Sequence, residues 1–356
     1  MIKEYPKVAV LILNWNNWVD TIECLESVFR INYPNYQVII IDNGSTDNSV
    51  DKIIKWAEGK QETMTPLPSH PLYYLSHPPV LKPILYIEYD KEEAENGGEE
   101  KKEIELSTKL INGKFKSMII IRLDKNLGFS AGNNVGIKYV LKKNDYDYIW
   151  ILNNDVVVDK DSLLNLMKEI NKYPNVGITG SKIYYYSEPK KISHAGGAIR
   201  LCVGISKHIG DGEYDINQYN SAKFVDYVTG ASIIISIRLL RQIGYFYENY
   251  FLYYEDTDLC VRARKKKWNI LYVPDSKIWH KISNSPENSA AIQNYYFTRN
   301  RLIFIKRNYP FCIIFVGLAT LRYSIFNNLI KKRWKHLLYG LRGIIDFIIN
   351  KGNCLH

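Results

Sequence analysis

The stretch YDYIWILNND, Tyr146–Asp155, decides the fold of this chain. Its apolar residues lie between Asp147 and the triplet Asn153–Asp155, a pattern typical of a short strand buried on both faces. In open α/β sheets, ligands bind outside the carboxyl ends of the strands, so Asp155 is a candidate ligand of a substrate or a metal ion. The triplet could instead be an ordinary turn, with an aspartate capping a helix that starts near residues 159–162.

Two stretches nearer the N-terminus repeat the pattern of a buried strand, a polar loop and a helix. The strands are predicted at Val8–Leu13 and Val38–Ile41, each followed by apolar residues at helical spacing. After the second strand Gly44 permits a tight turn, and Ser45 or Thr46 can cap the next helix. The chain therefore begins with two consecutive strand-and-helix units.

Polar residues follow both of these strands. Asn14 comes directly after the first and Asp42 directly after the second. Because right-handed crossovers set the ends of parallel strands on one edge of the sheet, we expect Asn14, Asp42 and Asp155 to share that edge. The sequence thus predicts an α/β fold with a mostly parallel central sheet.

Residues 58–117 interrupt this pattern. Six of the thirteen prolines fall at residues 66–83, and an acidic stretch follows them. Dense proline and charge disfavour a packed core, so we expect a flexible or partly ordered insertion within a domain of residues 1–288. Ile84–Tyr89 and Ile104–Leu110 could still form a small hairpin that covers the site.

A loop rich in glycine and asparagine, Asp124–Gly136, follows a predicted strand at Met118–Leu123. Its backbone could lie close against a ligand at the start of a helix. It matches neither of the common phosphate-loop patterns. A tight strand-to-helix turn, with Gly136 packed on the sheet, is the alternative.

Three carboxylates open a later helix, within Tyr250–Arg264. Glu255, Asp256 and Asp258 would all be favoured there by the free amides and the helix dipole, so capping is one explanation. Capping needs only one carboxylate, and the others resemble a base with supporting partners. Arg262, four residues after Asp258, can pair with it along the helix.

A further strand is predicted at Trp268–Val273, ending at Pro274, and His280 follows it in the sequence KIWH. Taken alone, such a histidine is more often a hydrogen-bonded structural residue than a ligand. The residues around it do not decide between these roles.

Residues 289–356 differ in kind from the rest. Phe311–Leu321 is nearly all apolar, but its eleven residues fall short of the ~20 that span a bilayer. Together with tyrosines and the basic cluster Lys331–Arg333, this run is typical of helices that lie in a membrane interface. A helical hairpin packed on the main domain is the alternative.

The overall charge indicates the kind of binding partner, and the cysteines indicate the cellular compartment. The formal net charge of +10 suits nucleic acid, an anionic substrate or an anionic membrane surface. Because no nucleic-acid motif is present and the basic residues concentrate beside the C-terminal apolar runs, lipid is favoured over nucleic acid. We expect a cytoplasmic protein, peripheral on the inner face of the cell membrane, because no signal peptide is recognisable and the cysteines show neither a CxxC pair nor a disulfide-like spacing. These cysteines are Cys24, Cys202, Cys260, Cys312 and Cys354.

Taken together, seven motifs resemble those of family 2 glycosyltransferases with the GT-A fold. They are VAVLILNWNN, IIIDNGSTDNS, NLGFSAGNNVGI, YIWILNNDVVV, TGASIIIS, FLYYEDTDLCVRARKKKW and IWH. The resemblance covers roughly residues 7–285, apart from the insertion, and is greatest to rhamnosyltransferase-like members of surface polysaccharide synthesis. It implies metal-dependent, inverting transfer of a sugar from a UDP- or dTDP-sugar to a glycan or a lipid-linked saccharide.

The resemblance also implies roles for the residues above. Asn153–Asp155 matches the DxD-type motif, with Asp155 and His280 as ligands of Mn²⁺ or Mg²⁺ and with asparagine at the first position. Asp256 is similar to the catalytic base, which would take the proton of the attacking hydroxyl. Supporting residues would be Glu255, Asp258 and Arg262. Donor-binding residues would be Asn14, Asn16, Asp42, Asn126, Gly128, Asn133, Asn134 and Asn154.

Two other readings remain. A sugar-phosphate nucleotidylyltransferase shares such a core, but it carries a Gly-rich signature with Arg and Lys after the first strand, where this chain has Asn14–Asn17. A non-catalytic partner that binds a nucleotide sugar or a glycan is the other, and the retained Asp155, Asp256 and His280 argue against it.

Overall fold

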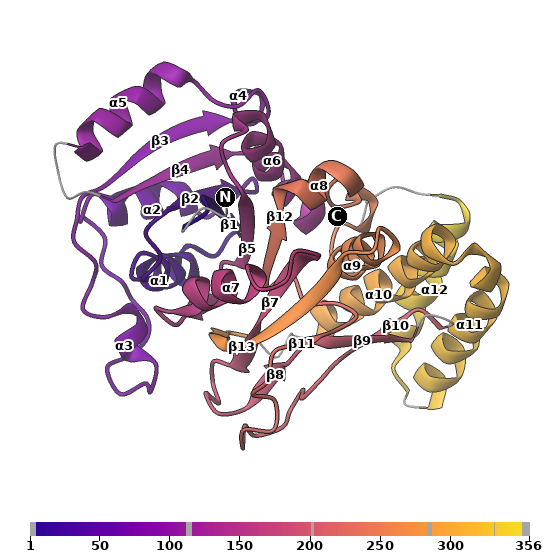
Figure 1. Ribbon diagram of the computed structural model, residues 1–356. Coiled ribbons are helices and arrows are strands. Elements are labelled where there is room, and N and C mark those ends of the chain that lie inside the picture. Colours follow the sequence, from indigo (N-terminus) through magenta and orange to yellow (C-terminus); the bar gives the residue numbers. More distant parts are fainter. Residues whose placement is uncertain (1–4, 112–115, 201–202, 283–286, 331, 351–356) are drawn as a thin grey trace.

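The computed structural model describes residues 5–111, 116–200, 203–282, 287–330 and 332–350 (Figure 1). Of the residues named above, Cys202, Lys331 and Cys354 lie outside these ranges.

A mixed, mostly parallel sheet forms the centre of the molecule (Figure 1). In spatial order its strands are β11 (Lys223–Phe224), β13 (Asn269–His280), β7 (Val176–Tyr185), β12 (Ser232–Ser236), β5 (Tyr148–Asn153), β1 (Val8–Asn14), β2 (Tyr36–Asp42), β4 (Lys116–Arg122) and β3 (Ile84–Asp90). From β5 to β3 neighbouring strands run parallel, whereas β12 is antiparallel to both of its neighbours. The predicted α/β class and mostly parallel sheet are confirmed.

Helices cover both faces of this sheet because successive strand residues point to opposite sides. Val8, Val10 and Ile12 of β1 belong to a core shared with α1 (Trp18–Val28), α2 (Ser49–Ala57) and α7 (Ser162–Ile170). Ala9 and Leu11 belong to the opposite core, shared with α6 (Gly128–Lys143), α8 (Ile237–Ile243) and α9 (Glu255–Lys265). The continuous apolar strands are therefore buried on both sides, as their composition indicates.

Much of the segment expected to be a flexible or partly ordered insertion has regular structure. The strand β3 adds to the sheet edge parallel to β4, and residues 104–110 belong to the helix α5 (Glu100–Ile111), so the hairpin that the sequence left open does not form. The helices α3 (Tyr73–Ser76) and α4 (Lys91–Glu95) complete the segment. A buried carboxylate of α1 holds it: Glu26 accepts hydrogen bonds from Val80 N at 2.7 Å and Lys82 Nζ at 3.0 Å.

Two predicted boundaries differ from the structure. The helix α2 begins at Ser49 after Asn48, because Ser45 turns back to bind the carboxylate of Asp42 and is not available as its cap. The strand β13 continues past Pro274, because a register shift against β7 leaves three residues of β13 unpaired there, and a bulge tolerates the missing amide of proline.

The C-terminal helices α10 (Glu287–Asn308), α11 (Ile313–Ile330) and α12 (Trp334–Ile348) pack together beyond α9, far from β3 (Figure 1). In the part of the chain that the structure describes, no helix is long and apolar enough to cross a membrane. Both outer helices expose large apolar side chains. On α11 these include Ile314, Phe315, Leu318, Phe326 and Ile330, and on α12 they include Trp334, Leu338, Ile345 and Ile348.

Candidate functional site

Asn14 and Asp42 lie side by side at the carboxyl edge of the sheet, where they are paired in register. Asn14 Nδ2 donates to Asp42 Oδ1 at 2.8 Å, and Ser45 donates its amide and its hydroxyl to the same carboxylate at 3.0 and 2.6 Å. Both side chains are buried, with 0% of Asn14 and 4% of Asp42 exposed. The Asp42 carboxylate is thus held in place by the protein alone.

The turn after β5 is tied to this pair. Asn154 Nδ2 donates to Thr21 Oγ1 at 3.0 Å and to Asn14 Oδ1 at 3.3 Å. Nearby, Asn16 Oδ1 accepts from the Thr46 amide at 2.7 Å. The structure therefore brings together Asn14, Asn16, Asp42 and Asn154, as expected from strands that end on one edge.

Asn43, which the sequence reasoning did not single out, connects this edge to the start of α6. Its Nδ2 donates to Asn126 Oδ1 at 2.9 Å, and its Oδ1 accepts from Leu127 N at 2.9 Å. The neighbouring Gly44 has φ of +69°, and a Cβ there would lie 2.5 Å from the Lys125 backbone, so only glycine allows this approach. The position of Asn43 directly after Asp42, at the end of a buried strand, is the sequence feature that could have identified it as a site residue.

Two adjacent asparagines of α6 have different surroundings. Asn134 exchanges hydrogen bonds with the backbone of Phe246 and also donates to Glu248, so its side chain serves the contact between α6 and that loop. Asn133 is fully buried; its Nδ2 donates to Phe129 O at 2.9 Å, while its Oδ1 has no hydrogen-bond partner among the described residues. The structure groups neither with the cluster around Asp42.

Asp155 and His280 meet where β6 (Val156–Val158) pairs with the end of β13. The imidazole Nε2 lies 3.0 Å from Asp155 Oδ1, and the bulge after Val273 sets the register that places it there. Burial alone would raise the pKa of Asp155, but its interactions with the His280 imidazole, its own backbone amide and the charge of Lys281 together outweigh burial, so the pKa lies below its ordinary value.

The donor set of this pair is compatible with a divalent cation. Asp155 Oδ1 is buried and has no aligned hydrogen-bond donor in the described part of the chain, despite its closeness to the imidazole. A carboxylate oxygen with a histidine nitrogen suits Mn²⁺, and the oxygen suits Mg²⁺. Among the described residues no cluster of three or more His, Cys, Asp or Glu side chains occurs, so a cation here would draw its other ligands from amide or carbonyl oxygens, a bound molecule or water.

Asp256 lies at the start of α9, half-buried. Its Oδ2 accepts from the Gly230 amide at 3.0 Å, and its Oδ1 accepts from the Thr257 amide at 2.5 Å. The preceding Glu255 is buried, and burial raises its pKa well above the ordinary value, with the charge of Asp256 raising it further. The surroundings of Glu255 therefore favour its protonated form more than those of an exposed glutamate do.

Gly230 and Ala231 join the two halves of the site. Gly230 donates to Asp256, and the carbonyl of the next residue, Ala231, accepts from the amide of Asn153 at 3.2 Å. The strand end that carries the Asn153–Asp155 triplet and the helix that carries Asp256 are thus attached to adjacent residues. From the sequence this stretch was recognised only as the motif TGASIIIS, with no role for either residue.

Asp258 and Arg262 form the predicted pair along α9, with Arg262 Nε 2.8 Å from Asp258 Oδ2. Asp258 is fully buried and also accepts from Asn308 Nδ2 of α10 at 2.7 Å. Arg262 Nη1 donates to the carbonyl of Ile243 at 2.6 Å, at the end of α8. These two residues hold α9 between its neighbours and do not enter the polar edge.

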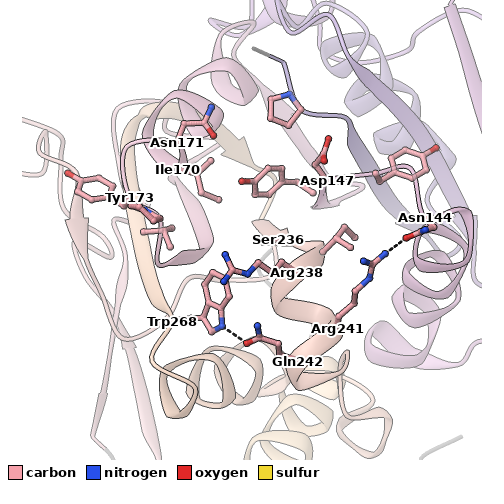
Figure 2. Close-up of a pocket in the computed structure, with 16 residues that line it drawn as sticks. Asn144, Asp147, Ile170, Asn171, Tyr173, Ser236, Arg238, Arg241, Gln242 and Trp268 are labelled. Carbon is pink, nitrogen blue, oxygen red and sulfur yellow. Dashed lines mark hydrogen bonds between the residues drawn. The ribbon is translucent and has the colours of Figure 1, made fainter. Parts of the chain in front are cut away.

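A large cleft, of about 820 Å³, lies at the opposite edge of the sheet, where β5 and β7 begin (Figure 2). Arg238 and Arg241 of α8 line it, with the Arg238 guanidinium 5.1 Å from the centre of the Trp268 ring. None of the candidate site residues lines this cleft.

Comparison with known proteins agrees with the fold and the motifs. The family model described as glycosyl transferase family 2 matches residues 9–65 and 98–242. The low-salt glycan biosynthesis hexosyltransferase Agl10 of Haloferax volcanii is 28% identical over 174 residues, which are 48% of this chain and 53% of the relative. The rhamnosyltransferase WbbL of Escherichia coli is 27% identical over 157 residues, 41% of this chain and 58% of the relative. The chain thus matches about half the length of these curated relatives.

A solved structure shares the fold across nearly the whole chain. The mannosyltransferase PcManGT from Pyrobaculum calidifontis, solved in complex with GDP-Man and Mn²⁺, superposes with a TM-score of 0.53. The two proteins are 12% identical, and the match covers 98% of this chain and 89% of the other.

Proposed function

The chain belongs to glycosyl transferase family 2, and from that premise we propose that its polar sheet edge transfers a sugar from a nucleotide-diphosphate sugar to an acceptor hydroxyl, with inversion at the anomeric carbon. The observation that carries the proposal is the pair Gly230 and Ala231. Through it Asp256 and the Asn153–Asp155 triplet are attached to neighbouring residues, which supports a proposed base and a proposed diphosphate site close to each other.

The donor nucleoside would bind where Asn14 and Asp42 are paired. The Asp42 carboxylate is already fixed by Asn14 and Ser45, so a ligand finds it ordered and loses little entropy in organising it. Asn16 and Asn154 border the same edge. A UDP- or dTDP-sugar is the proposed donor class.

Asp155 and His280 are the proposed protein ligands of Mn²⁺ or Mg²⁺. When bound there, the cation would neutralise the charge that develops on the diphosphate leaving group. The close approach of the two side chains without hydrogen-bond alignment supports this assignment.

Asp256 is the proposed general base. It accepts the proton of the acceptor hydroxyl while that oxygen bonds to the anomeric carbon from the face opposite the diphosphate. The bond from the anomeric carbon to the diphosphate oxygen breaks, and its electron pair leaves with the nucleoside diphosphate. Amide hydrogen bonds from Gly230 and Thr257 orient the carboxylate for this task.

A lipid-linked saccharide is the proposed acceptor, for surface polysaccharide or glycoconjugate synthesis. Ile314, Leu318, Phe326 and Ile330 are exposed on α11 at intervals that are multiples of four residues, which sets them along a stripe that winds gradually around the helix. Arg322 lies within the stripe, and Lys332 and Arg333 follow it, all exposed. Apolar side chains bordered by cations match an anionic lipid surface, so this stripe would hold the enzyme beside its acceptor.

A donor panel tests the proposal on the full-length chain. UDP-, dTDP- and GDP-sugars are each offered with Mn²⁺ or Mg²⁺ and membrane-extracted saccharide lipids, and the nucleotide products are separated chromatographically. Release of a nucleoside diphosphate from one donor, with a glycosylated lipid of inverted anomeric configuration, is expected. Formation of a nucleoside triphosphate and a sugar 1-phosphate when pyrophosphate is added would indicate a nucleotidylyltransferase instead, and absence of turnover with every donor would favour a non-catalytic partner.

A further inference from the structure

The loop of residues 250–254, which leads directly into α9, has an unusual backbone. Phe251 has φ of 61° and ψ of −59°, and Leu252 N donates to Tyr250 O at 2.7 Å, which together define the rare γ-turn with positive φ. The two residues that follow Leu252 are Tyr253 and Tyr254, with φ of 70° and 76°. Residues other than glycine keep such conformations only where surrounding contacts impose them.

One side chain of α10 imposes this shape. Asn300 is fully buried, and its Nδ2 lies within hydrogen-bond distance of three loop carbonyls. The accepting oxygens belong to Tyr250, Leu252 and Tyr253, at 2.8, 2.7 and 3.0 Å. If the loop adopted another shape, these three carbonyls would lose their hydrogen bonds to the Asn300 amide, and buried carbonyls without donors are costly.

Ring contacts from the same helix accompany the Asn300 amide. The ring of Phe251 stacks on Tyr296 with centroids 5.4 Å apart, and the ring of Tyr253 stacks on Phe297 at 4.3 Å. The turn of α10 that precedes Asn300 therefore packs on the loop as well.

The opposite side of the loop contacts the start of α6. The carbonyl of Phe251 accepts from the Phe129 amide at 2.6 Å. Gly128 has φ of +80°, and a Cβ there would come within 2.4 Å of the Phe251 ring. The shape of the loop therefore affects the helix that follows Asn126 as well as the helix that begins with Glu255.

We propose that Asn300 is a positioning residue of the transfer reaction, which holds the loop of residues 250–254 in the shape that presents Asp256 to the acceptor. The inference rests on the proposed function, since it takes Asp256 as the base. Its consequence is that α10 completes the catalytic site, although it lies beyond the polar sheet edge. Without the Asn300 donors the loop relaxes to common backbone angles, and Asp256, one residue beyond the start of α9, moves with it.

The variant Asn300→Leu tests this, with Asn294→Leu as its matched control. Asn294 is also on α10, but its Nδ2 donates to His336 O of α12 at 2.7 Å and not to the loop. We expect kcat to fall on the order of 10- to 100-fold in Asn300→Leu, as for a misplaced catalytic group, with a smaller change in the KM of the donor. Hydrogen exchange should rise at residues 250–258 in this variant, whereas in Asn294→Leu it should rise at α12.

Two outcomes would overturn the proposal. One is unchanged exchange at residues 250–258 in folded Asn300→Leu, and the other is an equal loss of kcat in both variants, which would indicate a general loss of stability. If Asn300→Leu does not fold, Asn300→Ser keeps one donor, and an intermediate kcat is expected. The exchange measurement needs no substrate, so it tests whether Asn300 holds the loop even if the wild type transfers no sugar. Absence of sugar transfer by the wild type would refute the proposed function but not the structural role of Asn300.

Discussion

Asp155 lies in the turn between β5 and β6 and His280 ends β13, yet Oδ1 of the first lies 3.0 Å from Nε2 of the second. If both bind the cation, His280→Ala should remove most of the metal-dependent stabilisation by donor. A donor at about 100 times its Kd stabilises a folded protein by about 2.7 kcal/mol. Thermal unfolding with donor, with and without Mn²⁺, measures this gain. His208→Ala, in the ribbon strand β10 (Ile205–His208), is the control, and a full donor effect in His280→Ala would contradict the assignment.

The variant Asp256→Asn should lower kcat by ~10²–10⁴-fold, because the amide cannot accept the acceptor proton. Its oxygen can still accept from the Gly230 amide, so the loop should stay in place and donor binding should persist. Asp211→Asn, at an exposed carboxylate that binds Tyr185, makes the same chemical change outside the site. Turnover close to that of the wild type in Asp256→Asn would rule out this base.

Glu255 predicts an unusual dependence of stability on pH. The folded protein retains the Glu255 proton above the ordinary glutamate pKa of ~4.3, because burial and the neighbouring Asp256 raise its pKa. The unfolded chain releases that proton, so this residue lowers the free energy of unfolding progressively as pH rises from ~4.3 toward the folded pKa. Glu255→Gln has no such cost, so its advantage over the wild type in urea unfolding should grow as pH rises above ~4.3. If the free energy of unfolding varied with pH in the same way for the variant and the wild type, this prediction would be contradicted.

Asp258 should matter for stability more than an exposed ion pair does. It is fully buried between Arg262 and Asn308, so Asp258→Ala would leave donors without a partner and should cost about 3–5 kcal/mol. The pair of Arg264 and Asp226, 2.8 Å apart with side chains 41% and 32% exposed, offers a comparison. Arg264→Ala, which leaves the hydrogen bond from the Ile199 amide to Asp226 in place, should cost at most about 1 kcal/mol. Equal costs in urea unfolding would show that Asp258 is not the link between α9 and α10.

The stripe on α11 should bind anionic lipid. Replacing Ile314, Leu318 and Phe326 by serine should abolish cosedimentation with vesicles that contain phosphatidylglycerol, since each large apolar side chain contributes about 1.5–3 kcal/mol when fully buried. Leu81→Ser is the control, because Leu81 is 89% exposed but lies in the segment before β3. Undiminished binding by the triple variant would place the lipid contact elsewhere.

Local pattern was sufficient for the parts of the site that depend on strand ends and helical spacing. The runs before Asn14, Asp42 and Asn153 are continuously apolar, so their polar ends had to meet at one edge once the strands were parallel. The pairing of Asp258 with Arg262 follows from their spacing of four residues. Both are short-range rules.

Other features depend on contacts between distant residues. The position of His280 follows from a bulge that is defined only against β7, so a proline that locally predicts a strand end was misleading. The chain between Thr63 and Lys82 is tied to α1 by Glu26, a charged residue that α1 buries and that composition would leave on the surface. Asn300 donates hydrogen bonds to a loop nearly 50 residues earlier in the chain, and no local sequence pattern predicts such a contact.

Asp256 is hydrogen-bonded to Gly230, and the strand end that carries the Asn153–Asp155 triplet is hydrogen-bonded to Ala231. The distance between these two anchor points is therefore set by covalent geometry rather than by side-chain packing. Consecutive Cα atoms are about 3.8 Å apart across a trans peptide, so the anchor points cannot drift when the surrounding loops change. Substitutions elsewhere in the crevice could therefore alter which sugar is accepted while the base keeps its place. A single residue inserted between the two would separate the anchors, and it could also shift β12 by one position and turn its buried side chains to the wrong faces.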